Sequence, residues 1–122
     1  MSTTLIDFVA RGETPDEWRL VIVEEGPWHG SIESQLRRVQ DRLYGAMDAA
    51  LDGEVASRFP ESVGKKFVIQ FDGYNLPDAQ VEAFFDDFRG AVLQTPDYKA
   101  ALVSNSFVKD ITFRINLASI SQ

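Results

Sequence analysis

The chain has no cysteine and only one histidine among its 122 residues. Without thiols it forms no disulfide, no cysteine-bound zinc site and no iron–sulfur centre. The single histidine, His29, does not suffice for a histidine-rich metal site. We therefore expect neither a bound metal nor a cofactor, and the redox compartment stays open.

Basic charge is also scarce, with 12 Lys and Arg against 19 Asp and Glu and a net charge of −7. Proteins that bind nucleic-acid backbones or anionic membrane surfaces need clustered Lys and Arg, so we expect neither partner. The acidic surface is compatible with a basic protein partner, although net charge also serves solubility alone.

No stretch approaches the ~18 consecutive apolar residues of a membrane-spanning helix. Residues 1–18 show neither the basic start nor the apolar centre of a secretion signal. The sequence therefore predicts a cytoplasmic protein with no membrane partner. Its 44% hydrophobic content predicts a single globular domain over residues 1–122.

Hydrophobic periodicity predicts the secondary structure. A two-residue period of apolar side chains predicts strands at 5–10, 18–23, 67–72 and 108–117, and the second of these carries apolar residues on both faces. Apolar residues three and four positions apart predict a helix of about 20 residues that follows the N-cap Ser31 and stops at Gly53. A second helix carries an apolar stripe over 81–92 after Asp78 as N-cap, with residues 75 and 76 as alternative caps. Shorter helical segments are predicted at 54–59 and 97–103.

The resulting order, β-β-α-β-α-β, predicts an α+β fold. We expect a two-layer α/β sandwich, a four-stranded mixed sheet in the order 1-2-3-4 with an antiparallel first strand and both main helices on one face. A ferredoxin-like arrangement needs a helix between the first two strands, and the turn at 12–16 leaves no room for one. The expected core side chains of the sheet are Ile6, Phe8, Trp18, Leu20, Ile22, Phe67, Ile69, Phe71, Ile111, Phe113 and Ile115.

Several local motifs carry a resemblance. They are LIDF at 5–8, the segment before Trp28, FPE at 59–61, GKKFVI at 64–69 and the helix after Pro77. With this spacing, residues 5–93 resemble a family of small bacterial proteins catalogued as domain of unknown function 6572. The resemblance implies an α/β domain of bacterial origin with no assigned activity and no catalytic residues.

Catalytic signatures are missing as well. The sequence contains no glycine-rich phosphate loop and no nucleophile-elbow motif. We expect no catalytic residue, and an enzyme is the less favoured interpretation. The alternative to a pure binding protein is a small-ligand-binding protein or enzyme that uses a pocket between two loops at the ends of strands. Its polar and aromatic residues are Trp28, His29, Asp72 and Tyr74.

The sheet face without helices is the most informative predicted surface. It combines apolar and polar side chains, a mixture suited to a subunit or protein interface. The predicted interaction residues are Leu5, Val9, Arg19, Val21, Val23, Val68 and Arg114, with Asp7, Gln70, Thr112 and Asn116 among them. A further apolar cluster, Phe84, Phe85 and Phe88, has helical spacing typical of a core, and a partner-binding stripe is the alternative.

The sequence thus predicts a non-enzymatic protein-interaction module. Two versions follow: a homodimer through the open sheet face, or an immunity-type protein whose negative charge neutralises a basic toxin.

Overall fold

A mixed sheet with helices on one side forms the architecture, which a computed structural model describes for residues 7–118. The elements in chain order are β1 (Phe8–Arg11), β2 (Glu17–Glu25), α1 (Ile32–Leu51), α2 (Glu54–Arg58), β3 (Lys65–Tyr74), α3 (Asp78–Ala91), α4 (Pro96–Ser104) and β4 (Val108–Ala118), with 3-10 turns η1 (Pro60–Ser62) and η2 (Val92–Gln94).

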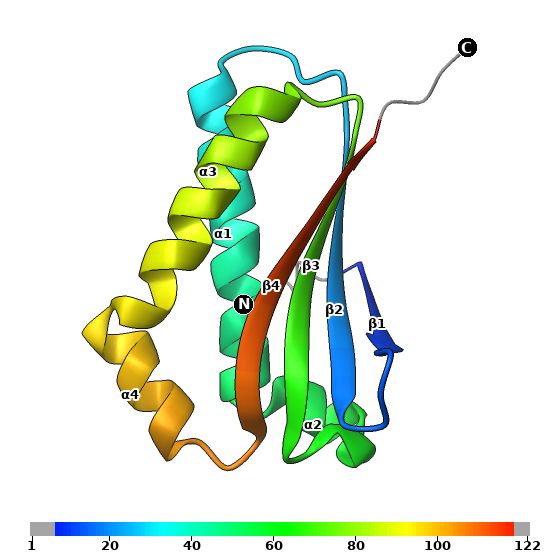
Figure 1. The fold of residues 1–122 in the computed structure, drawn as a ribbon, viewed down its shortest axis with the longest axis vertical. Coiled ribbons are helices and arrows are strands. Elements are labelled where there is room, and N and C mark those ends of the chain that lie inside the picture. Colours follow the sequence, from blue (N-terminus) through cyan, green and yellow to red (C-terminus); the bar gives the residue numbers. More distant parts are fainter. Residues whose placement is uncertain (1–6, 119–122) are drawn as a thin grey trace.

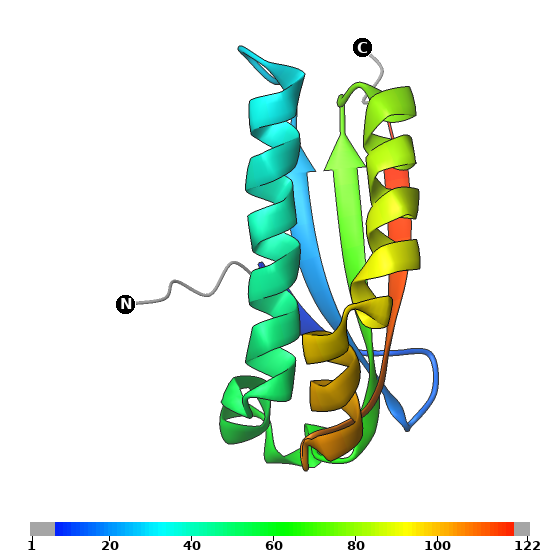
Figure 2. The same cartoon turned by 90° about the vertical axis from the view of Figure 1, so that its left-hand side faces the viewer.

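The four strands lie in the order β1-β2-β3-β4. β1 runs antiparallel to β2, whereas β2, β3 and β4 are mutually parallel. α1 and α3 cover the same face of this sheet (Figures 1 and 2). Right-handed crossovers between parallel strands place both helices there. The predicted fold class and strand order are confirmed.

Local sequence explains where the long helices begin and end. The hydroxyl of Ser31 accepts a hydrogen bond from the backbone N of Ser34 at 3.3 Å, which caps α1 as predicted. Gly53 follows α1 with φ of +89°, and a Cβ there would also meet the ring of Phe107. α3 differs from the prediction, because Pro77 is its N-cap and Asp78 is its first helical residue.

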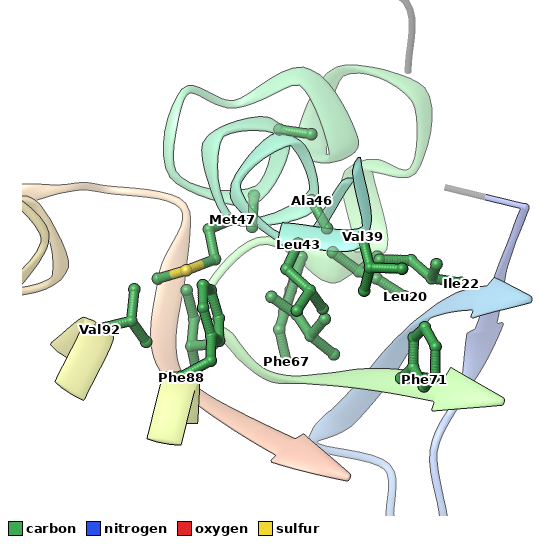
Figure 3. Packing of buried hydrophobic residues seen from close by; sticks show 14 of the residues in the cluster. Leu20, Ile22, Val39, Leu43, Ala46, Met47, Phe67, Phe71, Phe88 and Val92 are labelled. Atoms are coloured by element: carbon green, nitrogen blue, oxygen red, sulfur yellow. The ribbon is translucent and has the colours of Figure 1, made fainter. Parts of the chain in front are cut away.

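The core lies between the sheet and α1 and α3. Figure 3 shows Val39 and Leu43 of α1 pointing towards Leu20 and Phe67 of the sheet. The register pairs Trp18 with Phe67, and Phe67 with Ile111, on this face. The predicted core residues that are buried are Trp18, Leu20, Ile22, Phe67, Ile69, Phe71 and Ile111. Phe113 and Ile115 are only half-buried, because β4 is an edge strand.

The prediction of which β1 side chains face the helices is wrong. Val9 pairs with Leu20 and packs against the core, so it lies on the helical side and not on the open face. The hairpin sets this register, and a shift of one residue moves every side chain of a strand to the other face. Leu5 and Ile6, assigned to the open face and the core respectively, lie outside the described residues.

Within residues 7–118, no helix combines the length and apolar character needed to cross a bilayer.

Removing a core side chain tests this packing. Leu43 is fully buried in α1, whereas Ile32 in the same helix is 39% exposed. We expect Leu43→Ala to lower the free energy of unfolding by about 2–5 kcal/mol, because it leaves a cavity. We expect Ile32→Ala to change it by less than about 1 kcal/mol. Urea unfolding measures both, and equal effects of the two substitutions would contradict the packing.

Candidate functional site

The two loops of the predicted pocket meet through their backbones. The N–H of Gly26 donates to the carbonyl of Tyr74 at 2.7 Å. Gly26 also lies so close to the carbonyl oxygen of Asn75 that a Cβ would collide with it, which explains the glycine there.

The side chains of Trp28 and Asp72 lie on different faces of the sheet. The Trp28 ring packs against the core on the helical side, and His29 is exposed, with its carbonyl accepting from Gln35 Nε2 at 3.1 Å. The carboxylate of Asp72 accepts hydrogen bonds from Gln70 and Asn116, which belong to the opposite face of the sheet. The structure therefore separates Trp28 from Asp72, and the predicted grouping is wrong.

A buried carboxylate, Glu24, lies beneath α1 at the end of β2. It is 5% exposed. Arg38 binds both of its oxygens, at 2.6 and 2.7 Å, and Arg42 binds Oε2 at 2.6 Å. Trp28 Nε1 donates to Oε1 at 3.3 Å. All the strong donors around this carboxylate thus come from α1 and from the loop that leads to it.

Arg42 extends this network to the start of β1. Its Nη1 donates to the carbonyl of Val23 at 2.9 Å, and its Nη2 binds Asp7 Oδ2 at 2.6 Å. The same Asp7 oxygen accepts from the backbone N of Val23 at 2.7 Å. Asp7 therefore faces α1, and its predicted position on the open face is wrong.

Opposing effects determine the ionisation of Glu24. Burial of the carboxylate raises its pKa, whereas the hydrogen bonds and positive charges of Arg38 and Arg42 lower it, and the net pKa lies below the ordinary value of 4.5. The carboxylate is thus held ionised. Its donors occupy both oxygens, so the cluster fastens β2 and the start of the first hairpin to α1.

The open sheet face is bridged by a side chain from the β1–β2 turn. Glu13 Oε1 accepts from Arg19 of β2 at 3.2 Å and from Arg114 of β4 at 3.5 Å. Because β3 runs between these strands, the carboxylate reaches across β3. Val21 and Val68 lie on this face as predicted, yet both are buried. Val23 is half-buried, so it is the most accessible of the predicted valines on this face.

An aromatic groove lies instead on the helical side, between α1 and the segment from α3 to α4. Its central hollow has a volume of about 280 Å³. Neighbouring hollows share Gln40 and Phe84 with it on one side and Tyr44 and Thr95 on the other. We name this chain of hollows the helical groove, lined by Glu33, Leu36, Arg37, Gln40, Tyr44, Asp48, Leu51, Asp52, Phe84, Asp87, Phe88, Ala91, Val92, Thr95, Pro96, Asp97, Tyr98 and Ala101.

Ring contacts order the wall of the helical groove. Tyr44 stacks on Tyr98 with ring centroids 5.7 Å apart and planes 8° from parallel. Tyr44 also meets the edge of Phe88 at 5.3 Å, and Phe88 contacts Phe84 at 6.1 Å. Phe85 and Phe88 are buried, as the core interpretation predicted, whereas Phe84 is half-buried and lines the groove.

Acidic side chains surround these rings. The groove lining contains Glu33, Asp48, Asp52, Asp87 and Asp97, against one cationic residue, Arg37. The Tyr98 hydroxyl donates to Asp48 Oδ1 at 2.9 Å, and burial together with this hydrogen bond raises the pKa of Tyr98. The phenol therefore stays protonated. Among residues 7–118, no three His, Asp or Glu side chains group so as to hold a metal ion.

The Glu24 cluster generates a pH prediction. The pKa of Glu24 is lower in the folded chain, so its contribution to stability is complete above about pH 4.5 and is lost as the pH falls through the folded pKa. We expect Glu24→Gln to lower the free energy of unfolding at neutral pH by about 1–3 kcal/mol and to flatten its decline in acid.

Denaturant unfolding between about pH 3 and 7 measures this. Glu61→Gln is the matched control, because the Glu61 side chain is 61% exposed in its ion pair with Arg11. It should change the free energy by less than about 0.5 kcal/mol. An acid profile of Glu24→Gln that coincides with the wild-type profile would refute the assigned role.

Comparisons with protein-family models, with curated proteins and with solved structures find no match.

Proposed function

We propose that the protein is a non-enzymatic interaction module that binds a basic, amphipathic segment of another protein in the helical groove. The observation that carries this proposal is the combination of half-buried aromatic rings with five carboxylates along a chain of adjoining hollows. A binding groove for an amphipathic helix has this form, apolar along its floor and charged along its edges.

The apolar part of the groove supports the proposal. Phe84 and Tyr44 are half-buried and flank the central hollow, so a partner's aliphatic side chain would remove more of their surface from water. The buried residues Phe88 and Val92 lie beneath them. Because these belong to the core, the floor is preformed and costs little reorganisation on binding.

The charges favour a cationic partner. Asp48, Asp52 and Asp97 line one end of the groove, Asp87 its centre and Glu33 the other end. The net charge of −7 adds a long-range attraction for basic partners and opposes nucleic acid. Such complementarity speeds association and makes it dependent on salt.

The immunity-type version fits the same chemistry, since a basic toxin would present such a segment. We also propose that the protein is bacterial and cytoplasmic. The resemblance to the family of unknown function supports the bacterial origin. The open sheet face is less suited to an apolar partner because its valines are largely covered.

A designed peptide tests the groove. We would use a fluorescent peptide of about 18 residues with Leu and Lys at helical spacing, and a matched peptide with Glu in place of Lys. Fluorescence anisotropy should show binding of the Lys peptide that weakens severalfold between about 20 and 300 mM salt. The Glu peptide should not bind.

Two neighbouring aspartates of α3 separate groove binding from general attraction. Asp87 lines the groove, whereas Asp86 pairs with Arg89 at 2.9 Å. We expect Asp87→Lys and Phe84→Ala each to weaken the Lys peptide about tenfold, and Asp86→Lys about twofold or less. Circular dichroism checks folding. Equal losses for the two aspartate variants, or no binding of the Lys peptide, would contradict the proposal.

A further inference from the structure

β4 is a long, uncovered edge of the sheet. Ten of its 11 residues have register partners on β3 on one side, and no other strand of the described chain lies on its outer side (Figure 1). The opposite edge strand, β1, has only 4 residues. An edge strand presents unpaired N–H and C=O groups, which are a template for another strand.

The helix-facing side chains of β4 are incompletely covered. Phe113 and Ile115 are half-buried, whereas their register partners on β3, Ile69 and Phe71, are fully buried. The difference arises because a β3 residue has a strand on both sides and a β4 residue on one. A strand added at this edge would cover Phe113 and Ile115.

The charges on β4 are self-complementary. Asp110 and Arg114 lie on the open face at equal distances from Thr112 along the strand. In an antiparallel pair of two β4 strands centred on Thr112, each Asp110 faces the other copy's Arg114, and each Ile111 faces Phe113. A register centred on Arg114 would instead place the two guanidinium groups opposite each other, which is unfavourable.

We propose that the occupant of this edge is a second copy of the chain. The two β4 strands pair antiparallel about Thr112, so that the sheets of both copies join into one and all helices lie on the same side. Such an arrangement is a closed two-fold dimer. It leaves the helical groove free, and it uses a surface different from the open face predicted from sequence.

The N-terminal end of β4 limits the length of the segment that can pair with a second copy. The β3–β4 register shifts between Lys65 and Lys66, which leaves Lys109 without a register partner, and Lys109 is exposed. Bulges and lysines oppose edge pairing, so the paired segment is short and centred on residues 110–114. We therefore expect a weak, reversible dimer, because a short pair of strands buries little surface.

Sedimentation equilibrium from about 10 µM to 1 mM protein tests the pairing. The wild type should show a reversible monomer–dimer equilibrium. Arg114→Asp places a carboxylate opposite Asp110 and should raise the dissociation constant about tenfold or more. The double variant Asp110→Arg with Arg114→Asp exchanges the two charges and should restore the dimer to within about threefold of wild type.

Disulfide trapping tests the register, because the chain has no cysteine of its own. Thr112→Cys brings two thiols together at the two-fold axis and should give a covalent dimer on mild oxidation. Asn116→Cys is the control, since it lies on the same face of the same strand and is likewise exposed, but far from its copy in this register.

Several results would overturn the proposal. They are a wild type that stays monomeric at about 1 mM, a dimer that Arg114→Asp leaves intact, or Asn116→Cys cross-linking as fast as Thr112→Cys. If Arg114→Asp fails to fold by circular dichroism, the charge-exchanged variant and the cysteine pair decide the question. Peptide binding in the groove is measured separately and does not depend on this result.

Discussion

The buried carboxylate of Glu24 is the constraint on which the arrangement of the first strands and the long helix depends. A charge at 5% exposure is costly to bury without partners, so the fold must bring Arg38 and Arg42 of α1 to it. Those two arginines lie four residues apart on one face of the helix, which sets the rotation of α1 over β2. Through Arg42 the same network holds Asp7 and hence the start of the chain's first hairpin.

The orientation of α1 in turn determines the groove. With Val39 and Leu43 directed into the core and Arg38 and Arg42 directed to Glu24, the remaining positions Gln40 and Tyr44 point towards α3. Tyr44 contacts Phe88 and Tyr98, so the wall of the groove rests on the helix that Glu24 anchors. The molecule therefore has three distinct surfaces. They are the aromatic and acidic helical side, the open sheet face bridged by Glu13, and the exposed edge of β4.

Much of the fold could be predicted because every second residue over 18–22, 67–71 and 111–117 is apolar and the turn at 12–16 is too short for a helix. The face of β1 could not, because hairpin register decides it, and Val9 shows the consequence. A signal for the Glu24 cluster was present: the alternation Trp18, Leu20, Ile22 continues to Glu24, which places a carboxylate on the buried face. The prediction of the ligand loops failed because strand alternation in β3 places Asp72 on the open face. Trp28, in the loop after β2, packs instead on the helical side, where its Nε1 donates to Glu24. The groove depends on how α1 and α3 pack, and no periodicity within one helix reports that.

The role proposed for the helical groove is to receive a basic amphipathic segment. The most direct test is to record the ¹H–¹⁵N spectrum of the labelled protein during titration with the Leu and Lys peptide. We expect shift changes concentrated at Gln40, Tyr44, Phe84, Asp87 and Tyr98, with β4 and the open face unchanged. Changes concentrated on the open face, or spread evenly over all acidic residues, would contradict it.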